Sequence, residues 1–481
     1  MIPHLVEFKM EIWFNMRVPT YATVEEQARR LGVIQIKGPS TTSGDFPLPF
    51  RPQKVTLNLV ILLTFPCFSA RAQDLQLHRE QAKWMLRQVS QDVERNFYDP
   101  SLRGLDWQRL TAQASKEISR SNSWGDMFLA IFALLDSLHD SHTVFVAPQR
   151  NVKREFGFEA KPYGDKILIY KVKENGPAWE AGLRPGDELL TINGFRAERS
   201  TFFQLMLYLR ALHPVDVMQL RASRDGGPPS DVEVRAKMTS QPRVMEVFDA
   251  FNFNQLLREA EDQQKQFNDV GYDDLGNAVG YVRVASFMAD RDYLYSVMKK
   301  ARDSRVVVVD LRGNLGGAIE DLKFLAGFFV EQPTEIAQAV GRKRTESLTA
   351  KPEHPTIAGP MIVLVDSETA SAGEMFARYF QISRRAVVVG DKTSGRVNAA
   401  SYFSEKVGQD TIIPYGVEVA VARVLLPGGE ELENRGVNPD HLCIPTPAEL
   451  REKRDPCKAL ALSLARQSAN QSAPPSPGPG R

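Results

Sequence analysis

Apolar side chains recur at helical spacing in residues 74–150. Trp84, Met85, Val89, Val93 and Phe97 follow this pattern, and residues 124–138 repeat it. Such spacing is typical of helices that bury one face. We therefore expect residues 73–150 to form a helical cap. It should end at the polar sequence His139–Thr143 and lead into a strand at 144–146.

Residues 151–241 have a different pattern, with short apolar runs separated by Gly and Pro turns. Ile167–Tyr170 and Glu188–Ile192 have the length and composition of strands. The sequence Gly182–Asp187 predicts a tight turn before the second of them. We expect a small β-rich domain here.

Residues 242–447 alternate strand and helix patterns. Val306–Val309, Met361–Val365 and Ala386–Val389 are continuous apolar runs, as in strands buried on both faces. Helical patterns lie before and after the first of these runs, at Tyr293–Ala301 and Ile319–Val330. This order predicts an α/β core whose functional site lies at the carboxyl ends of the strands.

The two ends of the chain have other patterns. Residues 1–50 lack clear periodicity and are interpreted as an extension or a misread start. Residues 51–72 join a basic start, a short apolar run and Ala70-Arg71-Ala72, which are the parts of a secretory signal peptide; a buried strand is the alternative. The apolar run is too short for a stable membrane span. Residues 448–481 are expected to form a helix and then a Ser-, Pro- and Gly-rich disordered tail from Gln467.

Composition limits the function classes. The 481 residues are 43% hydrophobic and 25% charged, with a formal net charge of +1. This balance gives no sign of a nucleic-acid partner or a polybasic membrane surface. The signal peptide predicts a secreted or periplasmic protein that keeps two cysteines, Cys443 and Cys457. These either pair across a short C-terminal loop or remain free.

Two strand-to-helix turns carry candidate chemistry. Residues 310–317, DLRGNLGG, follow the run of valines, and their glycines allow a sharp turn with exposed N–H groups; a tight turn without a ligand is the alternative. Residues 366–374 place Ser371 among small residues at the start of a helix. Ser371 is there either a helix N-cap or a nucleophile favoured by the helix dipole.

A serine nucleophile needs a base, and the chain has seven histidines. His142 stands beside Ser141 in the polar turn after the cap; an ordinary exposed loop histidine is the alternative. His139 and His142 have the spacing of metal ligands, but the sequence lacks a third ligand cluster. We expect neither a metal nor an organic cofactor.

Residues 182–194, GLRPGDELLTING, resemble the corresponding segment of PDZ domains. This resemblance implies a groove that accepts a peptide C-terminus by strand addition. Phe156, Gly157 and Phe158 would form its carboxylate loop. A filled groove that serves only as a spacer is the alternative.

The chain as a whole resembles the C-terminal-processing (tail-specific) and tricorn-core family of serine peptidases over residues 80–445. The resemblance rests on D-S-H-T at the end of the cap, the PDZ-like insert, D-L-R-G-N-x-G-G, T-A-S-A-G-E-x-F, V-V-G-x-x-T-S-G and E-N-R-G-V-x-P-D. It implies a crotonase-like ββα sheet core with a helical cap and an inserted domain. Family members are often assemblies, so the resemblance also allows an oligomer.

The family implies roles for particular residues. Ser371 matches the nucleophile, and the N–H groups of Ala372 and of Gly316 or Gly317 match the oxyanion hole. Tail-specific members use a lysine base in a G-K-G turn, where this chain has Arg396. Arginine stays protonated and cannot act as a base.

Two bases remain as candidates. Lys392 is nearby but four positions early, and it is the alternative base. The tricorn-type branch uses a serine–histidine pair and a glutamate, which Ser141, His142 and Glu433 match. We therefore expect His142 to be the base, oriented by Glu433 directly or through Ser141. Arg396 would then be available to bind a substrate carboxylate.

The sequence thus predicts a secreted serine endopeptidase that cleaves unfolded polypeptides or those recognised at their C-termini. The alternative is a catalytically inactive peptide- or lipid-binding protein on the same fold, because the resemblance includes retinoid-binding relatives. A regulatory scaffold that uses only the PDZ-like groove is a third interpretation.

Overall fold

The computed structural model describes residues 57–148, 152–240, 270–408 and 412–471, with side chains from residue 73 onward. The extension expected at residues 1–50 lies outside the described residues, as does the tail after Gln471. Of the segment expected to be a signal peptide, only the helical backbone of residues 57–72 is described.

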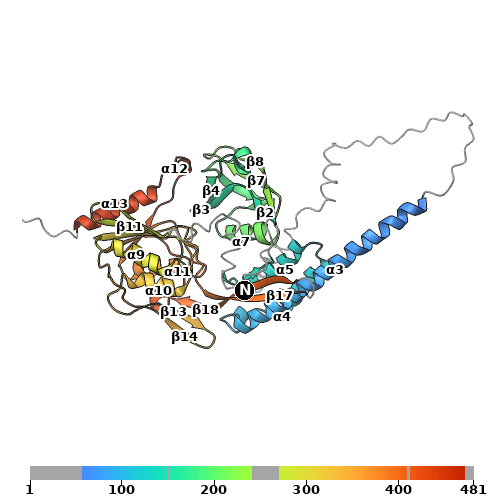
Figure 1. The fold of residues 1–481 in the computed structure, drawn as a ribbon, viewed down its shortest axis with the longest axis horizontal. Coiled ribbons are helices and arrows are strands. Elements are labelled where there is room, and N and C mark those ends of the chain that lie inside the picture. Colours follow the sequence, from blue (N-terminus) through green and yellow to red (C-terminus); the bar gives the residue numbers. More distant parts are fainter. Residues whose placement is uncertain (1–56, 149–151, 241–269, 409–411, 472–481) are drawn as a thin grey trace, which may run out of the picture.

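Three helices form the N-terminal cap, as the sequence predicted. They are α3 (Leu57–Asn96), which projects from the body, α4 (Trp107–Arg120) and α5 (Trp124–Asp136) (Figure 1). The side chains of Asp106 and Ser123 cap the first turns of α4 and α5. The expected strand β1 (Val144–Val146) follows the cap, and all three of its residues are buried.

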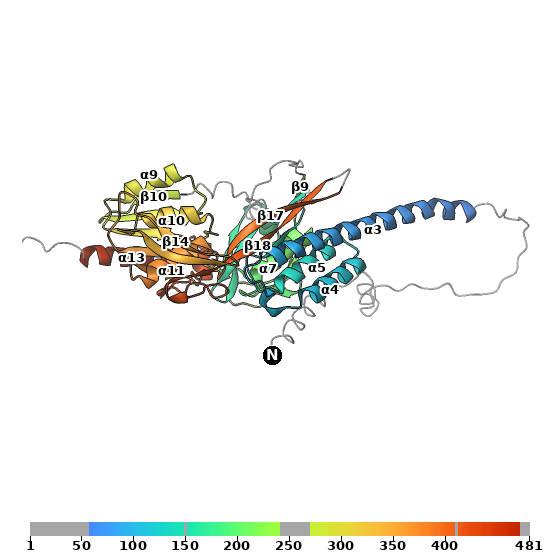
Figure 2. The same ribbon diagram turned by 90° about the horizontal axis from the view of Figure 1, so that it is seen from below.

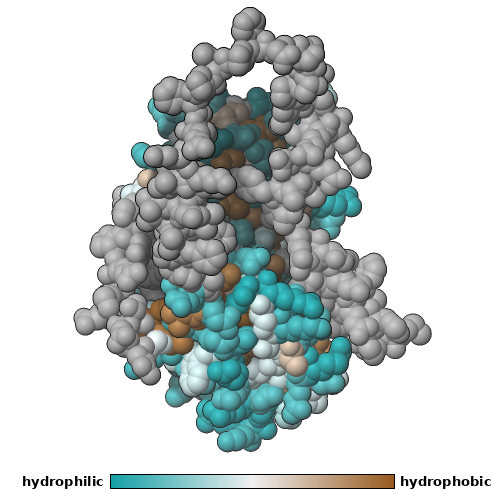
Figure 3. Space-filling model, turned by 90° about the vertical axis from the view of Figure 1, so that its right-hand side faces the viewer, coloured by the Kyte–Doolittle hydropathy of each residue, from teal (hydrophilic) through white to brown (hydrophobic). Residues whose placement is uncertain are grey.

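One part of the molecular surface is mainly polar. Seen from the side from which α3 projects, the lower part of the molecule is mainly hydrophilic (Figure 3). Within the part of the chain that is described, each helix is too short or too polar to cross a bilayer.

The insert is a β-rich domain, as expected. Its sheet has the strand order β3–β4–β5–β7–β8, and β6 pairs with β5. These strands are β3 (Phe158–Tyr163), β4 (Lys166–Val172), β5 (Glu188–Ile192), β6 (Phe195–Arg196), β7 (Val217–Ser223) and β8 (Ser230–Arg235). Helices α6 (Pro177–Glu180) and α7 (Phe202–Leu207) accompany the sheet, and α7 continues into the π-helical turn η2 (Tyr208–Leu212). A two-stranded ribbon of β2 (Val152–Glu155) and β9 (Lys237–Ser240) borders the insert.

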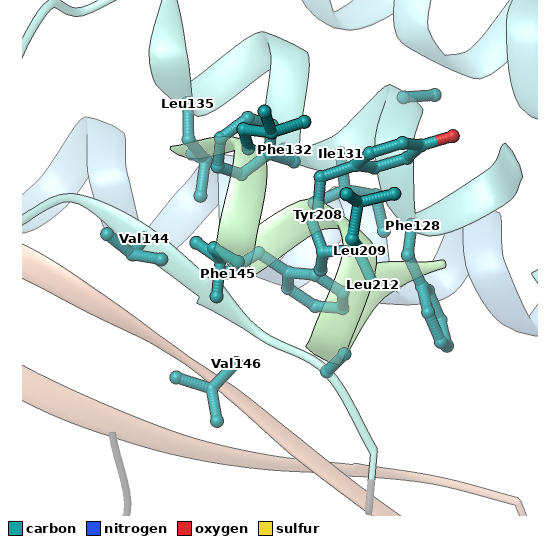
Figure 4. Packing of buried hydrophobic residues seen from close by; sticks show 14 of the residues in the cluster. Phe128, Ile131, Phe132, Leu135, Val144, Phe145, Val146, Tyr208, Leu209 and Leu212 are labelled. Carbon is teal, nitrogen blue, oxygen red and sulfur yellow. The ribbon is translucent and has the colours of Figure 1, made fainter. Parts of the chain in front are cut away.

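The insert packs firmly on the cap. Apolar side chains of η2 meet those of α5 and β1 in one buried cluster (Figure 4). The η2 contribution is Tyr208, Leu209 and Leu212, and Leu212 is fully buried. The approach is close, because a Cβ on Gly125 of α5 would lie 2.3 Å from the ring of His213. A large apolar interface of this kind restricts motion of the insert relative to the cap.

The core contains the α/β arrangement that the apolar runs predicted. Its sheet has the order β10–β11–β12–β15–β16–β19, and it is parallel from β11 onward. The strands are β10 (Val270–Asp274), β11 (Val279–Val284), β12 (Val306–Asp310), β15 (Met361–Val365), β16 (Ala386–Gly390) and β19 (His441–Leu442). Helices α9 (Arg291–Ala301), α10 (Ile319–Gly327) and α11 (Ala372–Ile382) cover one face, and α13 (Pro456–Gln471) covers the other.

A second, antiparallel sheet was not foreseen from the sequence. Its order is β1–β18–β13–β14, with β17 paired to β18. The strands are β13 (Thr334–Gly341), β14 (Thr345–Ala350), β17 (Ala399–Val407) and β18 (Ile413–Leu425). The long strand β18 joins β1 at the end of the cap to β13 in the core (Figure 2). It thereby brings the polar turn before β1 close to the core.

The C-terminal segment corrects one expectation. Helix α13 continues to Gln471, although the tail was expected to be disordered from Gln467. The reason is a row of alanines four residues apart, Ala461, Ala465 and Ala469, which is buried against the sheet. A disulfide joins Cys443, just after β19, to Cys457 in α13. Of the two alternatives left open by the sequence, the cysteines are therefore paired and not free.

Candidate active site

Three loops of the core follow the carboxyl ends of neighbouring parallel strands. Residues 311–318 follow β12, residues 366–371 follow β15 and residues 391–398 follow β16. Parallel strands place such loops at one edge of a sheet. The two turns singled out in the sequence are therefore in contact, and the Ala370 N–H donates to the Asn314 carbonyl at 2.9 Å.

Ser371 lies in a sharp turn between β15 and α11. Its backbone has φ 53° and ψ −119°, a sparsely populated conformation that costs a non-glycine residue about 1–3 kcal/mol. Residues that only cap a helix usually have an extended backbone, so capping alone does not explain this geometry. The Ser371 N–H donates to the Arg396 carbonyl at 2.7 Å. The residue also begins an 11-residue helix, whose dipole favours negative charge there.

Glu374 supports the turn from inside the protein. Its fully buried carboxylate accepts hydrogen bonds from the backbone N–H groups of Ser371, Gly395 and Arg396 at 3.2, 2.8 and 2.9 Å. It also accepts one from the Thr393 hydroxyl at 2.5 Å. Burial raises the pKa of Glu374 to about 7, and the four donors oppose that shift. Glu374 therefore ties the serine turn to the loop after β16.

Glu374 belongs to the motif T-A-S-A-G-E-x-F, and no role for it was predicted from the sequence. A signal was present, since serine followed three residues later by glutamate is the pattern of a capping box. In the structure the Glu374 carboxylate bonds the Ser371 N–H as that pattern requires.

Hydrogen bonds in the loop after β12, residues 311–318, distinguish between Gly316 and Gly317 as donors of the oxyanion hole. We call this segment the glycine loop. The Gly316 N–H already donates to Asn314 Oδ1 at 2.8 Å. The N–H groups of Gly317 and Ala372, by contrast, meet no acceptor among the described residues. An oxyanion hole requires donors that are free in the resting protein. The geometry therefore favours Gly317 together with Ala372.

Gly316 has a different role, because it makes room for the serine. A Cβ on Gly316 would lie 2.6 Å from Ser371 Cβ and 3.2 Å from Ser371 Oγ. Its φ of +100° also disfavours any other residue. The two turns thus pack directly on one another.

The Ser141–His142 pair meets Glu433 through a short network. Ser141 Oγ lies 3.0 Å from His142 Nδ1, and the Ser141 N–H donates to Glu433 Oε1 at 2.9 Å. Glu433 Oε2 accepts the N–H groups of Val397 and Asn398 at 2.9 and 3.2 Å. Of the two routes expected from the sequence, the contacts follow the one in which Glu433 reaches His142 through Ser141.

The segment 396–398 bonds the backbone of Ser371 and also the glutamate that holds Ser141 beside His142. Arg396 accepts the Ser371 N–H, and the next two residues bond the glutamate that holds Ser141. Within the described residues, the imidazole and the Ser371 hydroxyl share no direct hydrogen bond. Such contacts are often long in unliganded enzymes and tighten when substrate binds.

Charge and burial keep His142 neutral. Burial and the nearby positive charge of Arg396 lower the pKa of His142 to about 4, although Glu433 opposes this. Asp140, which the sequence reasoning missed, accepts the His142 N–H at 3.0 Å and the Asn398 amide at 2.8 Å. Burial and the charge of Glu433 raise the pKa of Asp140 to about 6.

The side chains of the remaining candidates, Lys392 and Arg396, make contacts of other kinds. The Lys392 side chain is exposed, and its carbonyl accepts a hydrogen bond from Arg199 of the insert. The Arg396 guanidinium stacks 3.9 Å from the ring centre of Phe203 on α7.

The expected carboxylate loop lies at the start of β3. Phe156 and Phe158 bury their side chains in the insert. The carbonyl of Gly157 accepts the Lys173 N–H at 2.9 Å. The described residues contain no group of three or more His, Cys, Asp or Glu that could hold a metal ion.

Substitution of Gly316 tests the packing of the two turns. Gly316→Ala places a methyl group against Ser371 Cβ, so the turns must separate. We expect labelling of Ser371 by a fluorophosphonate to slow about 100-fold, as for other small misplacements of a reacting group. Gly194→Ala, at an open turn of the insert with a similar φ, is the matched control. Equal labelling of the Gly316 variant and wild type would contradict the close packing.

The pH dependence of labelling separates Glu374 from His142. The carboxylate must be ionised to accept four hydrogen bonds, and the imidazole must be neutral to accept a proton. Glu374 loses its charge as pH falls through about 7, whereas His142 is neutral down to about 4. We therefore expect the labelling rate to fall as the pH drops through about 7. Glu374→Gln should be slow and should lack this step. A step that persists in that variant would assign it to another group.

Comparisons with known proteins find relatives of the core and of the insert. The model for Peptidase family S41 matches residues 278–443, and the PDZ domain model matches residues 168–201. Carboxyl-terminal-processing peptidase 1, chloroplastic, of Arabidopsis thaliana is 24% identical over 345 residues, which cover 69% of this chain and 65% of that protein. The carboxyl-terminal-processing protease of Synechocystis sp. is 25% identical over 367 residues, which cover 73% of this chain and 78% of that protein.

A solved structure shares the fold. Mature CPAF complexed with lactacystin superposes with a TM-score of 0.61 at 14% identity, over 82% of this chain and 100% of that one. At this level of identity the likeness concerns the fold alone, and it matches the α/β core with cap and insert described above. Residues 278–443 of the core therefore match peptidase family S41, a family of serine-type peptidases, and residues 168–201 of the insert match the PDZ domain.

Proposed function

We propose that this protein hydrolyses peptide bonds within polypeptides, with Ser371 as nucleophile and His142 as base. The observation that carries the proposal is the Glu433 carboxylate. Its Oε1 accepts the N–H of Ser141, the neighbour of His142, and its Oε2 accepts the N–H of Val397. The residue before Val397 is Arg396, whose carbonyl accepts the Ser371 N–H. These bonds connect Ser141, beside His142, through Glu433 to the segment that contacts the backbone of Ser371, and this connection supports the proposal.

The chemistry follows from these positions. Ser371 Oγ attacks the scissile carbonyl carbon while its proton passes to Nε2 of His142. The carbonyl oxygen becomes an oxyanion, which the N–H groups of Ala372 and Gly317 stabilise. The C–N bond then breaks, and the His142 proton goes to the leaving amine. A water molecule then gives a proton to His142 while its oxygen attacks the acyl carbon. The bond between that carbon and Ser371 Oγ breaks, and Oγ takes the proton back from His142.

Ser141 and Glu433 orient the base in this scheme. Ser141 accepts the Nδ1–H of His142 on its hydroxyl oxygen, which fixes the ring and leaves Nε2 unprotonated, so that Nε2 can take the proton of Ser371. Glu433 holds the Ser141 backbone and lies close enough to stabilise the imidazolium that forms during attack.

The substrates in this proposal are polypeptides recognised at their C-termini. The names of the relatives describe carboxyl-terminal processing. The insert would take part through the loop of Phe156, Gly157 and Phe158, whose N–H groups would face the terminal carboxylate.

Alanine variants test the assignments. With casein as substrate, Ser371→Ala should lower kcat about 10,000-fold or more, because the covalent step is lost. His142→Ala should show a comparable loss, and Lys392→Ala should keep most of the activity. Hydrolysis at the wild-type rate by the serine variant would reject the nucleophile. A loss confined to the Lys392 variant would assign the base to lysine.

Two further measurements accompany these variants. Wild-type protein that leaves Ser371 unlabelled by a fluorophosphonate would favour the inactive binding protein. A peptide substrate with an amidated C-terminus should be cleaved more slowly than its free-acid form. Equal rates of cleavage for the two peptides would reject the proposal that the insert recognises the C-terminus.

We also propose that the protein acts in an oxidising compartment, secreted or periplasmic. The basic and apolar sequence before Ala72 and the bond between Cys443 and Cys457 support this. N-terminal sequencing of exported protein should give a start at Gln73. Protein that stays in the cytosol with its cysteines reduced would contradict the proposal.

A further inference from the structure

Lys161 belongs to the insert, which we call the PDZ domain from here on, and it is buried against the core. It lies on β3, the edge strand of the domain, and its Nζ donates to Asp366 Oδ2 at 2.6 Å and to Glu368 Oε2 at 2.9 Å. Only 12% of the Lys161 side chain is exposed. The rings of Tyr163 and Tyr170 lie 5.6 and 4.9 Å from the ammonium group. A lysine rarely occupies such a place unless it is paired.

Asp366 connects the two turns that form the active site. Its Oδ1 accepts the N–H of Gly313 at 2.9 Å, from the glycine loop, and the N–H of Thr369 at 3.1 Å, from the serine turn. Its Oδ2 faces Lys161. One carboxylate oxygen therefore joins the turns, and the other binds the PDZ domain.

The charge on Lys161 keeps Asp366 ionised. Burial favours the neutral acid, but the ammonium group and the backbone donors lower the pKa of Asp366. Burial likewise favours neutral lysine, yet Asp366 and Glu368 raise the pKa of Lys161 well above its ordinary value. Removing one partner of such a pair leaves a buried charge without compensation.

Other contacts fix Lys161 in position. Ser367 Oγ donates to the Pro162 carbonyl at 2.6 Å, and the Gly164 N–H donates to Asp391 at 2.9 Å. Arg199 also pairs with Asp391 at 2.9 Å. On its other side the domain packs on the cap through η2, as described above (Figure 4). The lysine is thus presented by a domain that is held on two sides.

We infer that Lys161 is a positioning residue for peptide-bond hydrolysis, because its pairing with Asp366 holds the serine turn and the glycine loop in their reactive arrangement. The inference rests on the proposed function. It gives the PDZ domain a part in forming the catalytic site, separate from binding a peptide terminus.

Lys161→Met tests the inference with little change in side-chain volume. It should lower kcat about 10- to 100-fold, as a displacement of the reacting groups by up to about 1 Å would do. KM should change less than kcat, since Lys161 lies outside the groups proposed to contact substrate. Fluorophosphonate labelling of Ser371 should slow by the same factor as kcat. Circular dichroism and thermal melting report whether the variant folds.

Matched variants separate positioning from general loss of stability. Lys166→Met removes a lysine of the same domain whose ion pair with Glu188 is also 2.6 Å long but exposed, and it should leave kcat unchanged. Lys161→Arg keeps the charge and should restore most of the rate. Lys161→Met combined with Asp366→Asn removes both charges while Oδ1 can still accept its N–H groups. This double variant should react faster than Lys161→Met alone.

The outcomes are distinct. Wild-type protein that fails to label at Ser371 rejects the proposed function. Labelled wild type with an equally fast, folded Lys161→Met variant rejects the inference only. If Lys161→Met does not fold, the Arg and double variants decide. Their kcat values are then compared with that of Asp366→Asn alone. The inference would be overturned if Lys161→Arg were as slow as Asp366→Asn, or if the double variant were no faster than Asp366→Asn.

Discussion

Carboxylates that accept backbone N–H groups hold the active site together; Asp366 and Glu374 are buried, and Glu433 is half-buried. Loops at the end of a sheet lack the regular partners that strands give each other, so their N–H groups need other acceptors. Asp366 joins the glycine loop to the serine turn. Glu374 joins the serine turn to the loop after β16, and Glu433 joins that loop to Ser141 beside His142. Each link is a charge-assisted bond inside the protein, where such bonds are strong.

This arrangement places several negative charges close together, so positive charge must compensate for them. Much of that compensation involves the PDZ domain. Lys161 pairs with Asp366, Arg199 pairs with Asp391, and Arg396 of the core stacks on Phe203 of the domain. The same positive charge of Arg396 helps to keep His142 neutral. The insert therefore completes the electrostatics of the site as well as its shape, which explains why it packs so firmly on both cap and core.

Local patterns in the sequence were sufficient for much of the fold. The valine run of β12 and the spacing in α5 each determine an element through the side chains they bury. The antiparallel strands β13, β14, β17 and β18 were missed. β13 pairs with β14, and β17 with β18, next to it in the chain, but the sheet is completed by the pairing of β18 with β1 and β13, which are distant in the chain. Ser371 could be singled out from its small neighbours and its place before a helix. Its strained backbone could not, since that depends on Arg396 and Glu374.

The roles of the acidic residues show the same limit. Glu374 had a local signal, serine followed three residues later by glutamate. Asp140, Asp366 and Lys161 had no local signal. Their roles depend on contacts between residues more than 200 positions apart, such as Lys161 with Asp366 and Asp140 with Asn398. The choice between Gly316 and Gly317 also needed coordinates, since only they show that Asn314 already occupies the Gly316 N–H.

A crystal structure of the protein with a phosphonyl group on Ser371 would test the central claim most directly. The account predicts one phosphonyl oxygen about 2.7–3.1 Å from the nitrogens of both Ala372 and Gly317. It also predicts Nε2 of His142 within about 2.6–3.2 Å of Ser371 Oγ or of a phosphonyl oxygen, with Glu433 still bonded to Ser141. An adduct with the amine of Lys392 in place of the imidazole, or with the glycine loop turned away from the phosphonyl oxygen, would contradict it.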